Sequence, residues 1–227
     1  RKLMVKIISY SKTDHTPSDN LTELVSYCAR VSNPSNQNNT ATSRNLIKYL
    51  MDNKHWSPLE MVSICIEIET TRDIARQILR HRSFSFQEFS QRYASPLESL
   101  DFVRRGARLQ DKKNRQNSIS NNDHSLQDEW DIQQQEVIKL AKSVYAWAID
   151  KGIAKEQARA VLPEGLTMSK MYMNGTLRSW VHYIDLRTGN GTQREHQEIA
   201  NQCAIEIAKI FPMLLEEEDD DKQLDML

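Results

Sequence analysis

The sequence predicts a helix-rich α+β domain built around a small, mainly antiparallel sheet. Residues 61–69 predict a half-buried strand, because from Val62 onward isoleucine or valine alternates strictly with Ser63, Cys65, Glu67 and Glu69. Several other segments repeat apolar residues at helical spacing, and strands do not alternate regularly with helices, which argues against a doubly wound parallel sheet. The 227 residues show no internal repeat and can bury one core, so we expect a single domain.

The N-terminal part combines two predicted strands with three predicted helices. "VKIISY" (Val5–Tyr10) is typical of a strand, and a turn follows at 17–19. Asn20, with Glu23 three residues later, is a helix-start signature, and that helix should run to about Val31. After a polar loop over 32–43, apolar residues at 46, 47, 50 and 51 predict a second helix. The strand over 61–69 comes next, and residues 70–82 then switch to helical period.

The C-terminal part is mostly helical. Residues 102–131 have little apolar periodicity and predict a variable surface segment. A long helix passes through Val137 and Ala148 and stops at Gly152, and a short one over 154–163 ends at a proline. Further helices are expected from about Asn174 to Arg187 and around 199–207. The acidic residues 216–227 are expected to be a solvated tail.

Composition limits the classes of partner. The 30 Lys+Arg and 31 Asp+Glu give a net charge of -1, so no overall field attracts a nucleic acid polymer or an anionic membrane. The 3 cysteines are odd in number and show no Cys-x-x-Cys spacing, which argues against a disulfide framework and a zinc ribbon. No apolar run is long enough to span a membrane, and the first residues lack the pattern of a signal peptide. We therefore expect a cytoplasmic protein.

One stretch concentrates positive charge in this neutral chain. "RHRSFSFQEFSQRY" (Arg80–Tyr93) holds three arginines and a histidine, with Glu88 as its one carboxylate. The chain contains no Gly-rich phosphate loop, so side chains must hold any phosphate. Guanidinium groups suit that task because they stay charged and donate paired hydrogen bonds. The stretch therefore favours a small anionic ligand.

Other interpretations of these residues stay open. Basic residues in the last turn of a helix commonly complement its dipole, and this suffices for Arg76. His81 could be a packing residue, and each phenylalanine is more often a core anchor than a stacking platform. The cluster could also follow the phosphates of a nucleic acid, or be the solvated face of a non-enzymatic helical assembly protein.

Seven short motifs together resemble the flavin-dependent thymidylate synthases. "RHRSFSFQEFS" resembles that family's signature, an Arg-His-Arg followed after seven residues by Ser. The resemblance continues in "ARVS", "KHWSPLE", "ARQILRHR", "EFSQRYAS", "AKEQARAVLP" and "IDLRTGNGTQREH", in the family's order. It runs from about residue 3 to 212 and implies one synthase domain over 1–215, interrupted by the variable segment 102–131 and followed by the tail 216–227.

The resemblance implies an enzyme that converts dUMP to dTMP. The family uses FAD, 5,10-methylenetetrahydrofolate as carbon donor and NADPH as reductant, and assembles its sites from several chains of a homotetramer; no metal is implied. By similarity, FAD is bound by Ser32, His55, Ser57, Glu60, Arg80, His81, Arg82, Ser83, Thr176, Leu177, Arg178 and His182. By similarity, dUMP is bound by Gln77, Arg80, Glu88, Phe89, Ser90, Gln91, Arg92, Arg159 and Arg187.

Some of these residues have simpler structural explanations, and some positions differ from the family pattern. Arg159 could pair with Glu156, Arg187 could cap helix carbonyls, and residues 55–58 could be a simple turn. Ser83 stands where many members carry an apolar residue, and Gln87 stands where Asn is common. Gly191 stands where some members have His, so no flavin-stacking His is assigned there.

The hypothesis for the chemistry is activation of uracil without a covalent enzyme bond. Cys28, Cys65 and Cys203 are predicted to be small buried residues, because none has an adjacent His or cation in the sequence. Ser90 has no evident base beside it and is assigned to substrate binding. Arg187 is expected to lie against the imide edge of uracil, to stabilise the deprotonated ring and to raise electron density at carbon five.

Overall fold

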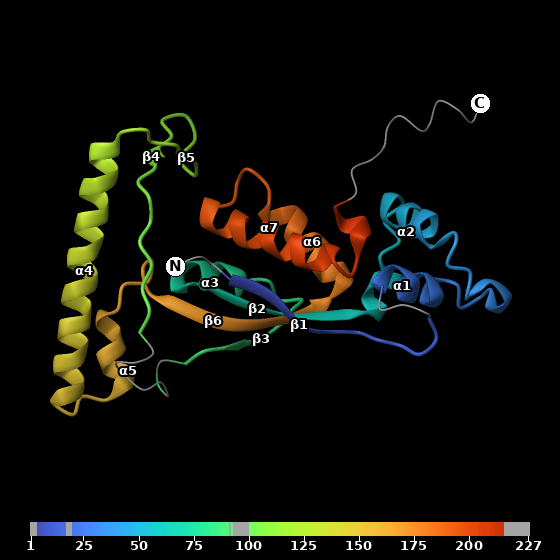
Figure 1. Ribbon diagram of the computed structural model, residues 1–227, viewed down its shortest axis with the longest axis horizontal. Helices are drawn as coiled ribbons and strands as arrows, with labels where there is room; N and C mark the ends of the chain where they lie inside the picture. The colour runs from blue at the N-terminus through green and yellow to red at the C-terminus, as the bar shows by residue number, and fades with distance from the viewer. Residues whose placement is uncertain (1–3, 17–19, 91, 93–99, 216–227) are drawn as a thin grey trace.

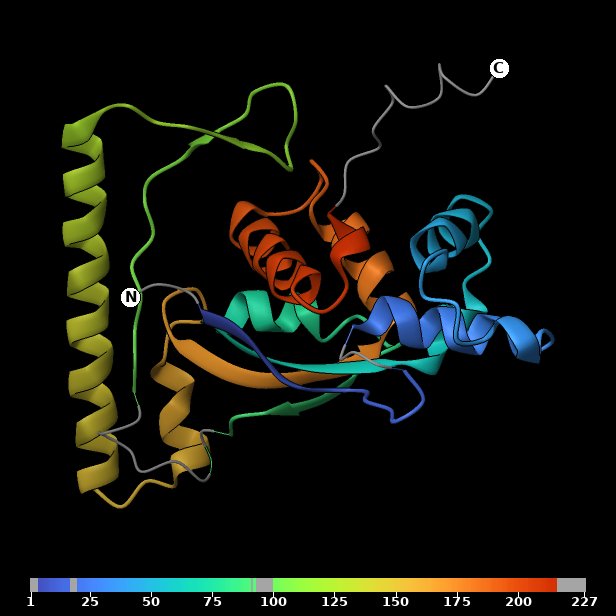
Figure 2. The ribbon, with the colours of Figure 1, turned by 45° about the vertical axis from the view of Figure 1, so that its right-hand side comes forward.

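A four-stranded antiparallel sheet, in the order β1-β2-β6-β3, organises the chain, and helices pack on one of its faces (Figures 1 and 2). The computed structural model describes residues 4–16, 20–90, 92 and 100–215. The predicted α+β class with a small antiparallel sheet is confirmed. Its strands are β1 (Met4–Tyr10), β2 (Ser63–Thr71), β3 (Ser85–Glu88) and β6 (Met168–Thr176), with a separate pair of β4 (Leu109–Gln110) and β5 (Ser118–Ile119).

The helices lie over one face of this sheet and beyond its two ends (Figures 1 and 2). In both views α3, α6 and α7 lie over one face, α1 and α2 lie beyond one end of the sheet, and the long α4 stands at the other (Figures 1 and 2). They are α1 (Leu21–Ala29), α2 (Ser43–Asp52), α3 (Arg72–Ile78), α4 (His124–Asp150), α5 (Lys155–Ala158), α6 (Leu177–Arg187) and α7 (Arg194–Ala208). Short 3₁₀ turns are η1 (Pro34–Asn36), η2 (Ser57–Met61), η3 (Arg159–Val161) and η4 (Pro212–Leu214).

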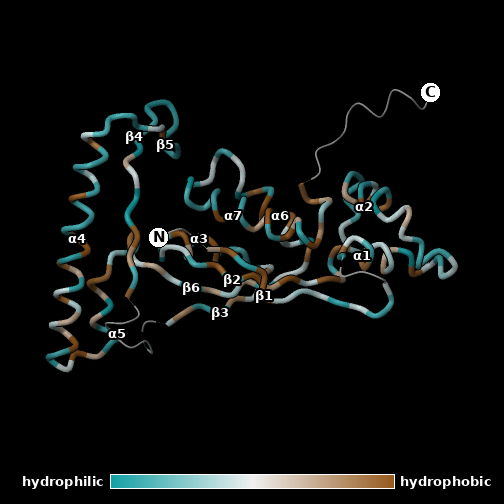
Figure 3. The backbone as a smooth tube through the Cα atoms, in the orientation of Figure 1, coloured by the Kyte–Doolittle hydropathy of each residue, from teal (hydrophilic) through white to brown (hydrophobic). Residues whose placement is uncertain are grey.

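The central strand β2 follows the predicted alternation. Ile64, Ile66 and Ile68 are 0% exposed and face the helices, which places the apolar core between the sheet and α3, α6 and α7. Figure 3 shows brown, apolar stretches in β2 and α3 and a teal, polar β4–β5 hairpin. On the opposite face, Glu67 lies between Lys6 of β1 and Lys170 of β6, at 3.4 and 2.8 Å. Cross-strand ion pairs therefore replace apolar packing on that face.

Two strands of the four-stranded sheet were not predicted. β6 was missed, and its last residues were assigned to a helix starting near Asn174; α6 in fact starts at Leu177, where the side chain of Thr176 accepts a hydrogen bond from the Ser179 N–H. β3 falls in a stretch expected to be a loop. Its four residues are mostly exposed, so its strand conformation comes from pairing with β6 rather than from a local apolar pattern.

The ring of Phe84 fixes the start of β3 against the core. It lies 4.8 Å from the Trp180 ring, edge to face, and is 7% exposed. Gly175 of β6 permits this approach, because a Cβ at that position would lie 2.5 Å from Cδ1 of Phe84. The ring thus anchors the chain immediately after the Arg80–Arg82 cluster.

The predicted surface segment 102–131 is more ordered than expected. Its last residues already belong to α4, which begins at His124 with Asp123 as its N-cap. The segment also contains the β4–β5 pair and an isolated bridge from Phe102 to Thr167. The expected end of the segment at 131 was wrong because the apolar residues in the first turns of α4, such as Leu126 and Trp130, are few and give no continuous stripe.

The remaining elements lie where the sequence patterns predicted them, although their ends differ by several residues. Asn20 caps α1 by accepting a hydrogen bond from Thr22 N at 2.8 Å, as its position predicted. The predicted turn at 17–19 and the tail 216–227 lie outside the described residues. Searching the helices that the structure describes reveals none with the length and apolarity that crossing a bilayer requires.

Candidate active site

Arg187 and His81 meet where two helices end. Arg187 is the last residue of α6, and His81 follows α3. The Nε–H of Arg187 donates a hydrogen bond to Nε2 of His81 at 2.9 Å, so Arg187 does not simply cap its own helix. Because Nε2 accepts, the neutral ring of His81 carries its proton on Nδ1. Burial, and then the positive charge of Arg187, lower the pKa of His81 to about 4, which keeps the ring neutral near pH 7.

Gln77 lies in a hydrogen-bonded cluster behind this pair. Its Nε2 donates to Oε1 of Gln193 at 3.0 Å, and its Oε1 faces Nδ1 of His196 at 3.0 Å. His196 is 0% exposed, and its Nε2 lies 2.9 Å from the Tyr183 hydroxyl. The Tyr183 ring in turn stacks edge to face with His81, with centroids 4.8 Å apart. The structure thus connects Gln77 to the Arg187–His81 pair through two residues, Tyr183 and His196, that were not predicted.

The arginines of the Arg-His-Arg triplet face solvent. Arg80 and Arg82 are exposed, and within the described part of the chain neither makes an ion pair. Ser83 is also exposed. The expectation that phenylalanines anchor the core is confirmed for Phe84, whereas Phe86 is half-buried and Phe89 is 42% exposed. The loop therefore combines a buried anchor with two uncommitted guanidinium groups.

A second set of predicted residues follows β3. Glu88 accepts a hydrogen bond from the Ser169 hydroxyl at 3.0 Å, and Ser90 Oγ accepts one from the Arg92 N–H at 3.3 Å. The guanidinium of Arg92 pairs with Glu156 at 3.3 Å. Glu156 therefore serves Arg92 and not Arg159, and the surface pair considered for Arg159 is wrong. Gln91 lies outside the described residues.

A third set lies around η2 and the start of α6. Glu60 pairs with Arg178 at 3.0 Å, and the His182 ring stacks edge to face with Trp56 at 4.7 Å. The turn expected at 55–58 is confirmed as the entry into η2. Leu177 is 0% exposed, so only its backbone can face a ligand. His55, Ser57 and the more distant Ser32, which follows α1, are exposed.

The three sets lie on different elements of the chain. Along α6, ten residues at about 1.5 Å each separate Leu177 from Arg187 by about 15 Å. The first and third sets therefore lie near opposite ends of α6.

The described residues also form a cavity away from these sets. It has a volume of about 600 Å³ and lies between residues 103–108 and α7. Arg105, Arg108, Glu195 and Gln127 are among its lining residues, and no predicted site residue lines it. No role was predicted for Glu195, although it lies in the family-like segment "IDLRTGNGTQREH". Resemblance to a motif does not say which residues a side chain contacts.

The cysteines lack the properties of a nucleophile. All three are free thiols, and burial raises the pKa of each above its ordinary value. The prediction of a buried residue is confirmed for Cys203, whereas Cys28 and Cys65 are half-buried. Among the residues with described placement, no three His, Cys, Asp or Glu side chains gather as a metal site would require.

Several known proteins are similar to this chain in sequence or in fold. The family model described as "Thymidylate synthase complementing protein" matches residues 13–213. A probable flavin-dependent thymidylate synthase of Paramecium bursaria Chlorella virus 1 is 47% identical over 212 residues, which cover 93% of this chain and 97% of the relative. The flavin-dependent thymidylate synthase of Synechocystis sp. is 46% identical over 189 residues, which cover 83% of this chain and 85% of the relative.

A solved structure agrees with these relatives. The UMP/dUMP methylase PolB from Streptomyces cacaoi, bound with 5-Br dUMP, aligns with a TM-score of 0.74 at 28% identity and covers 94% of this chain and 93% of its own. The family model matches most of the chain. Both synthases are nearly half identical to it, and the similarity extends over most of each relative. The chain therefore belongs to the family of the flavin-dependent thymidylate synthases.

Proposed function

We propose that this enzyme converts dUMP to dTMP and that Arg187 activates the uracil ring. The observation that carries the proposal is the hydrogen bond from Arg187 Nε to the neutral ring of His81. It orients the guanidinium without neutralising it, because a neutral imidazole accepts a hydrogen bond but offers no compensating negative charge. A fixed cation at the end of α6 is what a developing negative charge requires.

The remaining donors of Arg187 are available to substrate. Within the described residues, the two terminal nitrogens make no hydrogen bond to protein, so four N–H groups are left for a ligand. Two parallel donors match the adjacent oxygen and nitrogen of the uracil imide edge once that nitrogen has lost its proton and can accept a hydrogen bond. Such contacts stabilise the deprotonated ring and raise the electron density at carbon five. Raised pKa values of all three thiols support a mechanism without a cysteine adduct.

The other dUMP residues supply the anion-binding and sugar-binding contacts of this proposal. Arg159 is half-buried and, within the described residues, makes no ion pair, so its charge is free for a phosphate. Gln77, Arg80 and the segment from Glu88 to Arg92 complete the set. Arg92 would exchange its ion pair with Glu156 for substrate phosphate.

The third set fits a flavin nucleotide. Exposed Arg80 and Arg82 can take its phosphates, and the Trp56–His182 ring pair lies beside exposed His55, Ser57 and Glu60. Ser32, His81, Ser83, Thr176, Leu177, Arg178 and His182 complete the assignment. When bound, FAD supplies the redox chemistry of the transfer, with NADPH as reductant and 5,10-methylenetetrahydrofolate as carbon donor; the protein supplies position and charge.

We also infer a homotetramer whose sites are shared between chains. The distance of about 15 Å between the first and third sets, along α6 of one chain, supports this arrangement. A mixture of two inactive variants, Arg187→Ala and Arg159→Ala, tests it after joint refolding. If the two arginines act from different chains, some mixed sites are intact and activity returns. If mixed tetramers form and no activity returns, the two arginines serve a site within one chain.

The cellular setting proposed is the cytoplasm. Three free cysteines and no disulfide among the described residues suit a reducing compartment. Localisation of the tagged protein by fractionation tests this inference.

The test of the function is spectral and chemical. Purified protein supplied with FAD should show flavin absorption that bleaches with NADPH, and it should form dTMP from dUMP and the folate. A colourless protein that makes no dTMP but binds oligonucleotides with a steep salt dependence would instead support a nucleic-acid-binding module.

A further inference from the structure

Four hydrogen bonds form an unbroken chain from Tyr183 to Glu195. Tyr183 contacts His196 at 2.9 Å, His196 contacts Gln77 at 3.0 Å, Gln77 contacts Gln193 at 3.0 Å, and Gln193 contacts Glu195 at 3.0 Å. It joins α6, α7 and α3 inside the protein. Gln77 is its only member assigned to substrate.

Each bond in this chain has one consistent direction. The carboxylate of Glu195 can only accept, so Gln193 donates to it through Nε2 and accepts through Oε1. Gln77 donates to that Oε1 and must accept at its own Oε1, which makes Nδ1 of His196 the donor. Nε2 of His196 then accepts from the Tyr183 hydroxyl. Reversing the amide of Gln77 would place like groups against each other at both of its contacts.

Glu195, the acidic end of this row of hydrogen bonds, is held in place by Arg108. Arg108 binds both carboxylate oxygens of Glu195, at 2.6 and 2.9 Å. Burial by itself would raise the pKa of Glu195, but the hydrogen bonds that it accepts, first from Arg108, outweigh this and lower its pKa to about 2. Glu195 therefore stays an acceptor throughout the range in which the protein would work.

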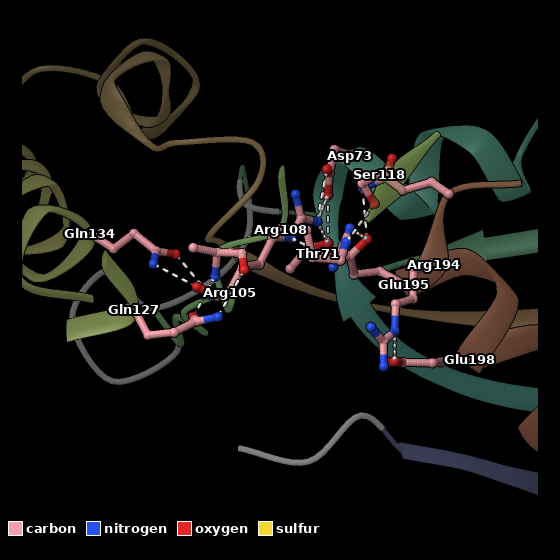
Figure 4. Close-up of polar contacts among 12 residues, drawn as sticks. Thr71, Asp73, Arg105, Arg108, Ser118, Gln127, Gln134, Arg194, Glu195 and Glu198 are labelled. Atoms are coloured by element: carbon pink, nitrogen blue, oxygen red, sulfur yellow. Dashed lines mark hydrogen bonds and ion pairs between the residues drawn. The ribbon is translucent and has the colours of Figure 1, made fainter. Parts of the chain in front are cut away.

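The backbone that carries Arg108 is itself clamped by α4 (Figure 4). The side-chain amide of Gln134 exchanges two hydrogen bonds of 2.7 Å with the backbone of Arg105, and Gln127 does the same with Ala107 at 2.7 and 2.8 Å. Arg105 also pairs with Asp73 at 2.8 Å, next to the start of α3. The surface segment 103–108 thus supports the end of the buried chain.

We propose that His196 is a positioning residue that, together with Gln193, holds the amide of Gln77 in one orientation for dUMP. With one N–H given to Gln193 and one lone pair taken by His196, Gln77 keeps one donor and one acceptor for substrate, in a set order. The inference rests on the proposed assignment of Gln77 to dUMP. It gives the buried histidine, which the mechanism does not otherwise use, a task in recognition.

The competing explanation is that His196 only fills the core. It lies on the buried stripe of α7 with Ile199, Cys203 and Ile207, so any substitution there affects packing. A packing role predicts loss of stability without a specific loss of dUMP affinity. The two roles therefore differ in what they do to binding.

Two amide substitutions separate the contacts of His196. In His196→Asn the side-chain nitrogen can take the place of Nδ1 and still donate to Gln77. In His196→Gln the longer side chain reaches the place of Nε2 and accepts from Tyr183, but Gln77 loses its donor. We expect His196→Gln to weaken dUMP binding about tenfold relative to His196→Asn, measured by calorimetry on flavin-loaded protein. Equal affinities, or the reverse order, would overturn the proposal.

A double-mutant cycle tests whether the effect passes through Gln77. In a Gln77→Ala background, His196→Gln should cause no further loss of dUMP affinity. A full additional loss would show that His196 acts independently of Gln77 and would contradict the proposal. Ile199→Val, in the same buried stripe, is the packing control and should lower the melting temperature while leaving dUMP affinity unchanged.

The outcomes also distinguish this inference from the proposed function. If the unaltered protein neither binds dUMP nor forms dTMP, the function itself fails. If it does both and the two His196 variants bind dUMP alike, only the positioning role fails.

Discussion

Arg187 and His81 are 106 residues apart in sequence, and the Nε of one donates to the Nε2 of the other at 2.9 Å. This contact uses only the Nε–H of the guanidinium. The two terminal nitrogens of Arg187 can therefore still donate a parallel pair of hydrogen bonds to a ligand. The histidine therefore aims the fork of Arg187, and its neutral state preserves the positive charge that the proposed chemistry needs.

Removing the acceptor of His81 should impair catalysis more than folding. His81→Phe keeps a ring against Tyr183 but leaves Arg187 Nε without its partner, so we expect kcat to fall about tenfold at saturating FAD. His81→Gln offers an oxygen near the position of Nε2 and should recover part of the loss. Steady-state kinetics with flavin content measured in parallel checks this. If the Phe variant with full flavin turned over normally, the aiming role of His81 would be wrong.

Gly175 should tolerate no side chain. A Cβ there would lie 2.5 Å from Phe84 Cδ1, and the ring cannot retreat easily because Trp180 lies 4.8 Å away. We expect Gly175→Ala to destabilise the fold by about 1–3 kcal/mol, seen as a lower melting temperature.

Gly191→Ala is the matched control for this substitution. Nothing lies within 4 Å of a Cβ at Gly191, so its melting temperature should stay close to that of the unaltered protein. Adding Phe84→Leu to Gly175→Ala should restore part of the stability by removing the clash. A Gly175→Ala variant as stable as the Gly191→Ala control would refute the close-packing account.

Stability should fall on mild acidification because of His196. Burial, and then Arg187 and His81, lower its pKa from 6.5 to about 3, so between these values the unfolded chain binds a proton that the folded chain does not. Stability is therefore greatest above pH 6.5 and declines below it, by up to about 1.4 kcal/mol per pH unit from this group. His81, whose pKa is about 4, acts in the same direction.

Thermal melting at about pH 7.5 and about pH 5 measures this dependence. The decline should be smaller in His196→Asn, which cannot take up the proton. Glu195, with its pKa lowered to about 2, loses its contribution only at lower pH and does not obscure the comparison. An unchanged difference between the two pH values in His196→Asn would contradict the assignment.

A cysteine-free variant should remain active. Cys28→Ser and Cys65→Ser change half-buried positions, and Cys203→Ala removes a buried thiol at a small cost in packing. Because no thiolate is required by the proposed chemistry, dTMP formation should persist when the variant is assayed with all cofactors. Complete loss of dTMP formation in a folded, flavin-loaded variant would instead favour a thiol adduct.

The sequence predicted the elements that have a clear apolar period. In β2 the isoleucines at 64, 66 and 68 are fully buried, as their alternation predicts, although Glu67 on the other face is buried as well. β6 was missed because its inward face is Ser169, Met171, Met173 and Gly175, which gives a weak apolar signal, and because its pairing with β2 is non-local. The early turns of α4 were missed because their few apolar residues, Leu126, Trp130 and Ile132, are largely exposed and form no continuous stripe.

The sequence predicted only part of the candidate site. Resemblance pointed to Arg187, His81 and Gln77, but not to their contacts, since hydrogen bonds across 106 or more residues leave no local pattern. His196 did leave a signal, because it lies three residues before Ile199 and seven before Cys203, on the buried stripe of α7. That spacing predicts a buried histidine, although its partners on α3 and α6 emerge only from the fold.

Whether Arg187 activates the uracil ring is best measured as dTMP formation by Arg187→Ala, with the flavin content determined in the same sample. We expect the variant to keep bound FAD that NADPH still bleaches, while dTMP formation falls by a factor on the order of 10³, the scale for losing a main electrostatic stabiliser. Near-normal dTMP formation by a flavin-loaded Arg187→Ala enzyme would contradict the role of Arg187 in activating the substrate.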